Sequence, residues 1–350
     1  MRYRKLKLAL VALFLSAAVT LAAAEIMLRA AGFKPWERLV SDKDWGGSMN
    51  EPDSVLGWKR KPGQYTVKAF VPGEEDLKVT IQPGGWRATG REAQGGRPRL
   101  VVVGCSFTEG QWLSDEETVA WKLQAKFPEI AVQNYGVAGY GTYQSLLLME
   151  RIFAEPNPPK MVLYGFIENH GRRNVASVEL LEAWTKASRT APRFPYVSLN
   201  GEGELVRHLP DGYPQWPLRE HSALVNFSQK MYAYAWLIAE KRRWTQAAVT
   251  EKLILEMDNL AKRNGAQFAV VTLVMDRGTG KPTYIELFEK KNIPYIDCDY
   301  PLTDEFTVPE DGHPNDIMAD LYAECMADGI KEKSSVLIGR KSAQSAALFS

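Results

Sequence analysis

The sequence predicts an α/β fold in which helices cover both faces of a central parallel sheet. Short runs that are apolar throughout recur along the chain, and segments with helical spacing separate them. Strands buried on both faces have this uniformly apolar character, whereas strands with one face in water alternate. The alternation of strand and helix indicates that the strands run parallel. We therefore expect a three-layer sandwich, helix on sheet on helix.

The elements follow in chain order from these two patterns. The expected strands are residues 100–103, 131–134, 161–166, 268–273 and 295–297. The expected helices are residues 117–127, 145–153, 245–264, 284–291 and about 316–330. Gly265 ends the helix at 245–264, because glycine is favoured just past a helix C-terminus. A hairpin is expected earlier in the chain, from residues 65–71 and 78–81 around a Pro-Gly turn.

The same patterns divide the chain into segments. Residues 1–30 form an anchor or signal peptide, and residues 31–98 a wrapping segment that contains the hairpin. The main domain covers 99–332. Residues 171–244 interrupt its alternation with several prolines and an aromatic helix, so we expect an insertion or lid there. The Ser/Ala-rich end, 333–350, is expected to be disordered.

The N-terminus predicts export from the cytoplasm. Four cations in residues 2–7 precede an uncharged run of 17 residues, 8–24. As a helix this run is about 26 Å long, against a hydrocarbon core of about 30 Å. The cations should stay in the cytoplasm, which places the rest of the chain outside it. Residues 22–24 also fit a small-residue cleavage pattern, so a single membrane helix and a cleaved, secreted or periplasmic form both remain open.

Composition excludes several classes of protein. The formal net charge is 43 − 42 = +1, which argues against a nucleic-acid binder. Cys105, Cys298 and Cys325 can form at most one disulfide, and their spacing leaves the pairing open. Cysteine and histidine spacing matches no metal site. Residues 277–282 resemble a phosphate-binding loop, but Met275 and Pro282 break the motif. We therefore expect no metal and no cofactor.

Polar residues follow the predicted strands at one edge of the sheet. Ser106 comes after the first strand, Gly139 after the second, Asn169 after the third, and Glu310-Asp311-Gly312-His313 after the last. The carboxyl ends of parallel strands meet at one rim, where ligands bind in open α/β sheets. The sequence therefore predicts that these residues converge.

Their chemistry is that of serine-based acyl transfer. Ser106 would be the nucleophile and His313 its base. A carboxylate, Asp311 or Glu310, would hold the imidazole tautomer. The backbone N–H groups of Ser106 and Gly139 and the side-chain amide of Asn169 would stabilise an oxyanion.

The four blocks resemble, in order and spacing, those of the SGNH (GDSL-type) hydrolase superfamily. Gly104-Cys105-Ser106-Phe107 is similar to the first block, and Gly139, Asn169 and His313 match the characteristic residues of the later ones. The resemblance covers about residues 80–330, and the apolar N-terminus looks like that of a membrane-anchored bacterial branch. It implies a flavodoxin-like SGNH hydrolase fold and action on acyl esters, including acetylated carbohydrates, lipids and simple esters.

Three positions depart from the family pattern. Cys105 stands where the family has Asp, which puts the hydrogen bonding of this turn in question. Glu310 occupies the usual Asp position three residues before His313, and Asp311 lies two before. We favour Asp311 because Asp is the usual residue type. His170 follows Asn169 where Asp is common, and we interpret it as a polar contact at the rim.

The sequence thus predicts an envelope serine esterase or deacylase that acts on an acyl ester of a carbohydrate or lipid. One alternative is an O-acyltransferase that uses the same site, since access decides whether water or a sugar accepts the acyl group. The other is a non-catalytic glycan-binding protein that retains the fold, which the Cys105 substitution suggests.

Overall fold

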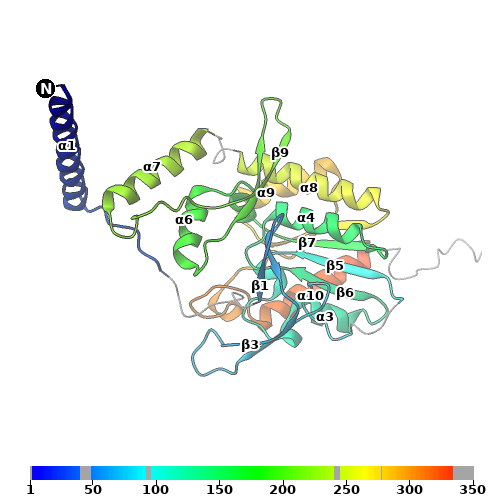
Figure 1. Cartoon of the computed structure of the whole chain (residues 1–350). Coiled ribbons are helices and arrows are strands. Elements are labelled where there is room, and N and C mark those ends of the chain that lie inside the picture. The colour runs from blue at the N-terminus through cyan, green and yellow to red at the C-terminus, as the bar shows by residue number, and fades with distance from the viewer. Residues whose placement is uncertain (1, 40–48, 92–95, 240–244, 277, 334–350) are drawn as a thin grey trace, which may run out of the picture. The chain divides into compact units, whose positions relative to one another are not determined.

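The computed structural model describes residues 2–39, 49–91, 96–239, 245–276 and 278–333, and it forms two compact units (Figure 1). Unit 1 comprises Met1–Ser41, Ser177–Arg193 and Gly212–Arg243. Unit 2 comprises Asp42–Ala176, Phe194–Asp211 and Trp244–Ser350. The expected insertion at 171–244 is thus shared between the two units. The expected disordered tail, apart from Lys333, lies outside the described residues.

A five-stranded parallel sheet forms the centre of unit 2. Its strands are β5 (Arg99–Gly104), β6 (Ala131–Gly136), β7 (Met161–Ile167), β10 (Gln267–Val274) and β11 (Tyr295–Asp297). They lie in the order β11-β10-β7-β5-β6, and every pair is parallel. All five strands expected from the sequence are present. Every residue of β5 and β7 is buried, which explains their uniformly apolar character.

Helices cover both faces of this sheet, as Figure 1 shows. One apolar cluster joins the sheet to α4 (Thr142–Phe153), α8 (Gln246–Arg263) and α9 (Gly280–Lys291). A second cluster joins the opposite face to α3 (Val119–Lys126) and α10 (Asp316–Lys333). The predicted α/β three-layer sandwich is confirmed.

Helix boundaries differ from the expected ones where polar side chains or glycine set the ends. α3 begins at Val119 because the Thr118 hydroxyl accepts a hydrogen bond from the N–H of Trp121; a 3₁₀ turn, η1 (Asp115–Glu117), precedes it. α4 begins three residues before the expected start. Two further short helices, α2 (Ser106–Glu109) and α5 (His170–Asn174), follow β5 and β7, and η3 (Asp304–Phe306) follows β11.

Three antiparallel hairpins accompany the sheet in unit 2. β3 (Gly63–Val67) pairs with β4 (Leu77–Ile81), which confirms the hairpin expected in the wrapping segment, although its first strand ends at Val67. β1 (Asn50–Asp53) pairs with β2 (Gly57–Arg60) in the same segment. β8 (Phe194–Leu199) and β9 (Leu205–Asp211) form a hairpin inside the expected insertion.

Unit 1 contains α1 (Arg2–Ala30), α6 (Val178–Ala187) and α7 (Ala223–Ala239). Two buried aromatic side chains of this unit, Trp36 and Tyr213, stack at 5.3 Å, and the Arg219 guanidinium lies 4.4 Å from the Trp36 ring centre. Within the described residues, α1 alone is long and apolar enough to cross a membrane, and none of its apolar window is buried. This helix is compatible with a membrane anchor or a signal sequence.

The structure shows which two cysteines pair, a question that the sequence leaves open. Cys298 and Cys325 form a disulfide between the end of β11 and α10, and Cys105 is free and buried.

Candidate active site

The turn that carries Ser106 depends on glycines at three neighbouring strand ends. The register places Gly104 opposite both Gly136 and Gly165. A Cβ on Gly104 or Gly165 would lie 2.2 Å from Thr108 Oγ1, and one on Gly136 would lie 2.4 Å from the backbone nitrogen of Glu109. Because these residues have no side chain, α2 can pack directly across the ends of β5, β6 and β7. Ser106 is the first residue of α2.

Cys105 does not disturb this turn. Its side chain is fully buried in the apolar cluster that α3 and α10 share with the sheet. The turn closes through the backbone, since the Cys105 carbonyl accepts hydrogen bonds from the N–H groups of Thr108 (3.0 Å) and Glu109 (2.9 Å). No carboxylate is therefore needed at position 105 to hold the turn.

Ser106, His313 and Asp311 form a hydrogen-bonded chain in which the imidazole of His313 contacts both of the other side chains. The Ser106 hydroxyl is 2.8 Å from His313 Nε2. The other ring nitrogen of His313, Nδ1, hydrogen-bonds to Asp311 Oδ1. Ser106 is 3% exposed, while the His313 and Asp311 side chains are partly buried. Residues more than 200 positions apart in the sequence thus form a hydroxyl–imidazole–carboxylate chain.

A tight turn before α10 holds the imidazole and the carboxylate. The Val308 carbonyl accepts hydrogen bonds from the N–H groups of Asp311 and Gly312, and the N–H of Val308 donates to the His313 carbonyl at 2.8 Å. Gly312 has a φ of 83°, and Glu310 has a φ of 64°. This left-handed backbone reverses the chain, so that Asp311 and His313 project to the same side.

The Glu310 side chain does not project toward the imidazole of His313. Its side chain is exposed, and the described part of the chain contains no hydrogen bond or ion pair between Glu310 and His313. Asp311, two residues before the histidine, makes the contact. Of the two candidate carboxylates, Asp311 is therefore the one that contacts the imidazole.

The surroundings of Asp311 favour its ionised form. Burial acts to raise its pKa, but the hydrogen bonds and the electrostatic interaction with the His313 ring outweigh burial, and Trp112 adds to them. The net result is a pKa of Asp311 below its ordinary value. A carboxylate that stays ionised can hold an imidazole in one tautomer.

The loop after β6 is tied to α2 by a buried carboxylate. Glu109 Oε2 accepts the N–H of Ala138 at 2.8 Å, directly before Gly139. Gly139 has a φ of 88°, which turns the chain. Among the described residues, the backbone N–H groups of Ser106 and Gly139 donate no hydrogen bond to another protein group. Both remain able to donate to a bound molecule.

Asn169 lies where the sequence predicts, between β7 and α5, and is exposed. Its Oδ1 accepts a hydrogen bond from Arg172 at 2.8 Å, so its amide NH₂ is the group left to face a ligand. In the described residues Asn169 makes no hydrogen bond to Ser106 or His313.

His170 is not the polar rim contact that we expected. It is completely buried, and its Nδ1 lies 2.7 Å from the Tyr164 hydroxyl. Burial, with a smaller effect of Arg173, lowers the pKa of His170 well below the ordinary value, so the ring is neutral. Its position one residue into α5 turns the side chain into the interior.

Two buried arginines of the wrapping segment support the site. Neither was assigned a role from the sequence, although Gly85-Trp86-Arg87 resembles a motif of the membrane-anchored bacterial branch. Arg60 donates to both Glu109 oxygens at 2.6 and 2.7 Å, and both side chains are almost fully buried. Arg87, also buried, donates to the carbonyls of Glu109, Gly110 and Leu113 and to Asp115. Nothing local distinguishes these arginines from surface cations, so only the tertiary structure identifies them.

A second serine–histidine pair lies elsewhere in unit 2. Ser198 Oγ is 2.7 Å from His208 Nε2 across the β8–β9 hairpin. The His208 ring stacks on Tyr196 at 4.3 Å with an interplanar angle of 7°. The sequence contains no block pattern around these residues, and we did not predict them as a site.

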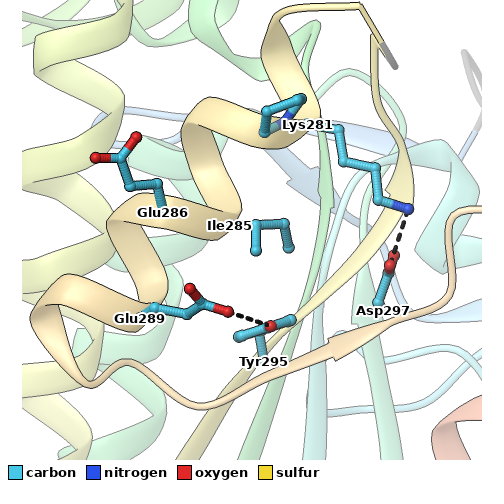
Figure 2. Close-up of a pocket in the computed structure, with 7 residues that line it drawn as sticks. Lys281, Ile285, Glu286, Glu289, Tyr295 and Asp297 are labelled. Carbon is cyan, nitrogen blue, oxygen red and sulfur yellow. Dashed lines mark hydrogen bonds and ion pairs between the residues drawn. The ribbon is translucent and has the colours of Figure 1, made fainter.

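A cavity of about 510 Å³ opens beside α9 and β11, away from the predicted site residues (Figure 2). Figure 2 shows Lys281 reaching Asp297, and Glu289 reaching the Tyr295 hydroxyl. Lys281 also pairs with Asp299 at 3.3 Å. Lys281 thus bridges two carboxylates at the end of β11, and none of the predicted site residues lines this cavity.

Comparisons with known proteins gave structural likeness only. No protein-family model matches the sequence, and no curated protein matches it. A member of the lipolytic G-D-S-L family from Veillonella parvula is 12% identical; the match covers 68% of this chain and 99% of that one, with a TM-score of 0.39. Esterase EstA from Pseudoalteromonas is 13% identical, with 67% and 97% covered and a TM-score of 0.39. Salicylyl-acyltransferase SsfX3 is 10% identical, with 70% and 57% covered and a TM-score of 0.36.

Proposed function

We propose that this protein is a serine esterase or deacylase that hydrolyses an acyl ester through Ser106, His313 and Asp311. One observation carries the proposal: the hydrogen-bonded chain from the Ser106 hydroxyl through the imidazole to the Asp311 carboxylate. A serine hydroxyl is a weak nucleophile until a positioned base takes its proton. The similarity of the four sequence blocks to SGNH hydrolases agrees with this chemistry.

The proposed reaction has two steps. As the Ser106 oxygen attacks the ester carbonyl, His313 Nε2 takes the hydroxyl proton, and the Asp311 carboxylate stabilises the imidazolium. The N–H groups of Ser106 and Gly139 and the Asn169 amide stabilise the oxyanion. His313 then gives its proton to the departing alcohol, which leaves Ser106 acylated. Water, deprotonated by His313, attacks the acyl group and releases the acid and the free serine.

We further propose that α1 anchors the enzyme in a membrane with the catalytic unit outside the cytoplasm. The exposed apolar helix and the cations in its first two turns support this arrangement. The Cys298–Cys325 disulfide agrees with an oxidising compartment, since such bonds are rare in the cytosol.

A fluorophosphonate probe tests the nucleophile without knowledge of the natural ester. We expect the folded protein to be labelled at Ser106, and the label to disappear in Ser106→Ala while the circular dichroism spectrum stays unchanged. Absence of labelling in the folded wild-type protein would refute the esterase and favour a binding protein. Product analysis with an added sugar would show whether water or a hydroxyl acceptor takes the acyl group.

A further inference from the structure

Exposed apolar side chains are concentrated in unit 1. Outside α1, nine large apolar side chains of the described residues are exposed, and six of them belong to this smaller unit. They are Phe33, Leu39, Trp216, Leu218, Met231 and Tyr232. Apolar side chains scattered singly over a surface are ordinary, but a concentration of them marks an interaction site.

Helix α7 exposes two large apolar side chains and buries a polar one. Met231 and Tyr232 are 53% and 51% exposed, whereas Gln229 and Ala233 are fully buried. Gln229 Oε1 accepts a hydrogen bond from the N–H of Trp216 at 2.7 Å, so this polar side chain is bonded inside the unit. A helix at an aqueous surface normally turns its polar residues outward. The outer side of α7 is therefore suited to an apolar environment.

The start of α7 is fixed to the end of α1. The Glu25 carboxylate accepts hydrogen bonds from the Ser222 hydroxyl (2.8 Å) and from the N–H groups of Ala223 (2.9 Å) and Leu224 (2.7 Å). Arg29 pairs with Glu25 at 2.6 Å and donates to the His221 carbonyl. These contacts satisfy the free N–H groups of the first turn of α7. The exposed apolar side chains of unit 1 thus begin where the candidate membrane helix ends.

We propose that unit 1 rests on the lipid bilayer, with Trp216, Leu218, Met231 and Tyr232 inserted among the headgroups of the membrane that α1 spans. This proposal depends on the membrane anchor proposed above. Continuity with α1 argues for lipid as the occupant, because Glu25 ties the two helices together within one unit. Tryptophan and tyrosine are the aromatic residues enriched at membrane interfaces.

Spin labels on the full-length protein test this contact. Because Cys105 is buried and the other two cysteines form a disulfide, a single introduced surface cysteine is the reactive one. Labels would be placed at Leu218→Cys and Met231→Cys, with the protein in vesicles of phosphatidylcholine and phosphatidylglycerol. We expect molecular oxygen, which concentrates in lipid, to relax both labels more than a water-soluble nickel chelate does.

Two further labels separate the outcomes. The label at Leu209→Cys, on a 73% exposed leucine of β9 in unit 2, should be relaxed more by the nickel chelate than by oxygen. Stronger relaxation by oxygen there would contradict a lipid-facing surface specific to unit 1.

A label at Leu15→Cys, in the middle of α1, reports on the anchor itself. If Leu15 is in lipid while Leu218 and Met231 are in water, the surface proposal fails and the anchor stands. If Leu15 is also in water, the anchor fails. Labels at 218 and 231 that neither agent reaches would indicate a protein partner or second copy instead and overturn the proposal.

Discussion

Two serine–histidine pairs in unit 2 have nearly the same geometry and very different surroundings. The hydroxyl oxygen lies 2.8 Å from the imidazole nitrogen in Ser106–His313 and 2.7 Å in Ser198–His208. Distance alone therefore does not distinguish a nucleophile from a structural hydrogen bond.

The difference lies in what surrounds each pair. Ser106 begins a helix at the carboxyl end of a central strand, near two backbone N–H groups able to donate to a ligand, and His313 is held by Asp311. Ser198 and His208 lie diagonally across an antiparallel hairpin, and stacking on Tyr196 fixes the ring. Such diagonal pairs stabilise sheets. The oriented carboxylate and the strand-end position are the features on which we base the proposal that Ser106–His313 is the reactive pair.

Removing the two serines gives the largest expected contrast. Ser106→Ala should reduce kcat for a nitrophenyl ester by about 10⁶-fold, the scale seen when a triad serine is removed. Ser198→Ala should leave kcat close to that of the wild type. Steady-state kinetics on both purified variants measures the contrast. Equal losses in the two variants would contradict our assignment of the nucleophile.

The carboxylate is the next test of the comparison. Asp311→Asn should reduce kcat by about 10⁴-fold, because asparagine favours the wrong imidazole tautomer. Glu310→Gln is the matched control, since the exposed Glu310 makes no contact with His313, and its kcat should not change. If the Glu310 variant lost more activity than the Asp311 variant, Glu310 would be the orienting residue.

Removing Asn169, the proposed oxyanion donor of the third sequence block, should have a smaller effect on kcat. Asn169→Ala is expected to lower kcat by about 10²–10³-fold, the usual cost of one such donor. The fluorophosphonate reaction should slow as well, while Arg172→Ala, which removes only the partner of the Asn169 oxygen, should have little effect. An Asn169→Ala variant with unchanged kcat would remove this residue from the site.

The buried pair Arg60–Glu109 should act by positioning. Glu109→Gln leaves Arg60 buried without its counter-charge, which costs about 3–5 kcal/mol of the free energy of unfolding. It also weakens the tie between α2 and the Ala138 N–H, so kcat should fall more than KM rises. Denaturant unfolding and kinetics together check this, with the exposed Glu116→Gln as the control. A variant that loses stability but keeps the wild-type kcat would show that Glu109 has a structural role only.

The smallest expected effect is a shift in pH dependence. Trp112 is one of the groups that lower the pKa of Asp311. Trp112→Phe removes this influence, so the Asp311 pKa rises and the carboxylate is protonated at a higher pH. Activity should therefore be lost earlier as the pH falls, and the acid limb of kcat/KM should move to higher pH. A limb at the wild-type position or lower would contradict the proposed influence of Trp112.

The sequence alone determined the sheet and the rim of candidate residues. Uniformly apolar runs such as 100–103 identify strands buried on both faces, and parallel topology brings the turns after them to one edge. These are local signals, and they suffice to predict that Ser106, Gly139, Asn169 and the 310–313 turn follow strands of one parallel sheet.

The tertiary structure decided which groups meet. The left-handed backbone at Glu310 and Gly312 brings Asp311 rather than Glu310 to the imidazole, and packing joins Cys298 to Cys325. Burial alone distinguishes Arg60 and Arg87 from surface cations, and it places His170 in the interior. The disulfide and the burial of Arg60 and Arg87 depend on residues far apart in the chain approaching within a few ångströms, and the 310–313 turn depends on backbone dihedral angles. Hydrophobic periodicity carries no information about either.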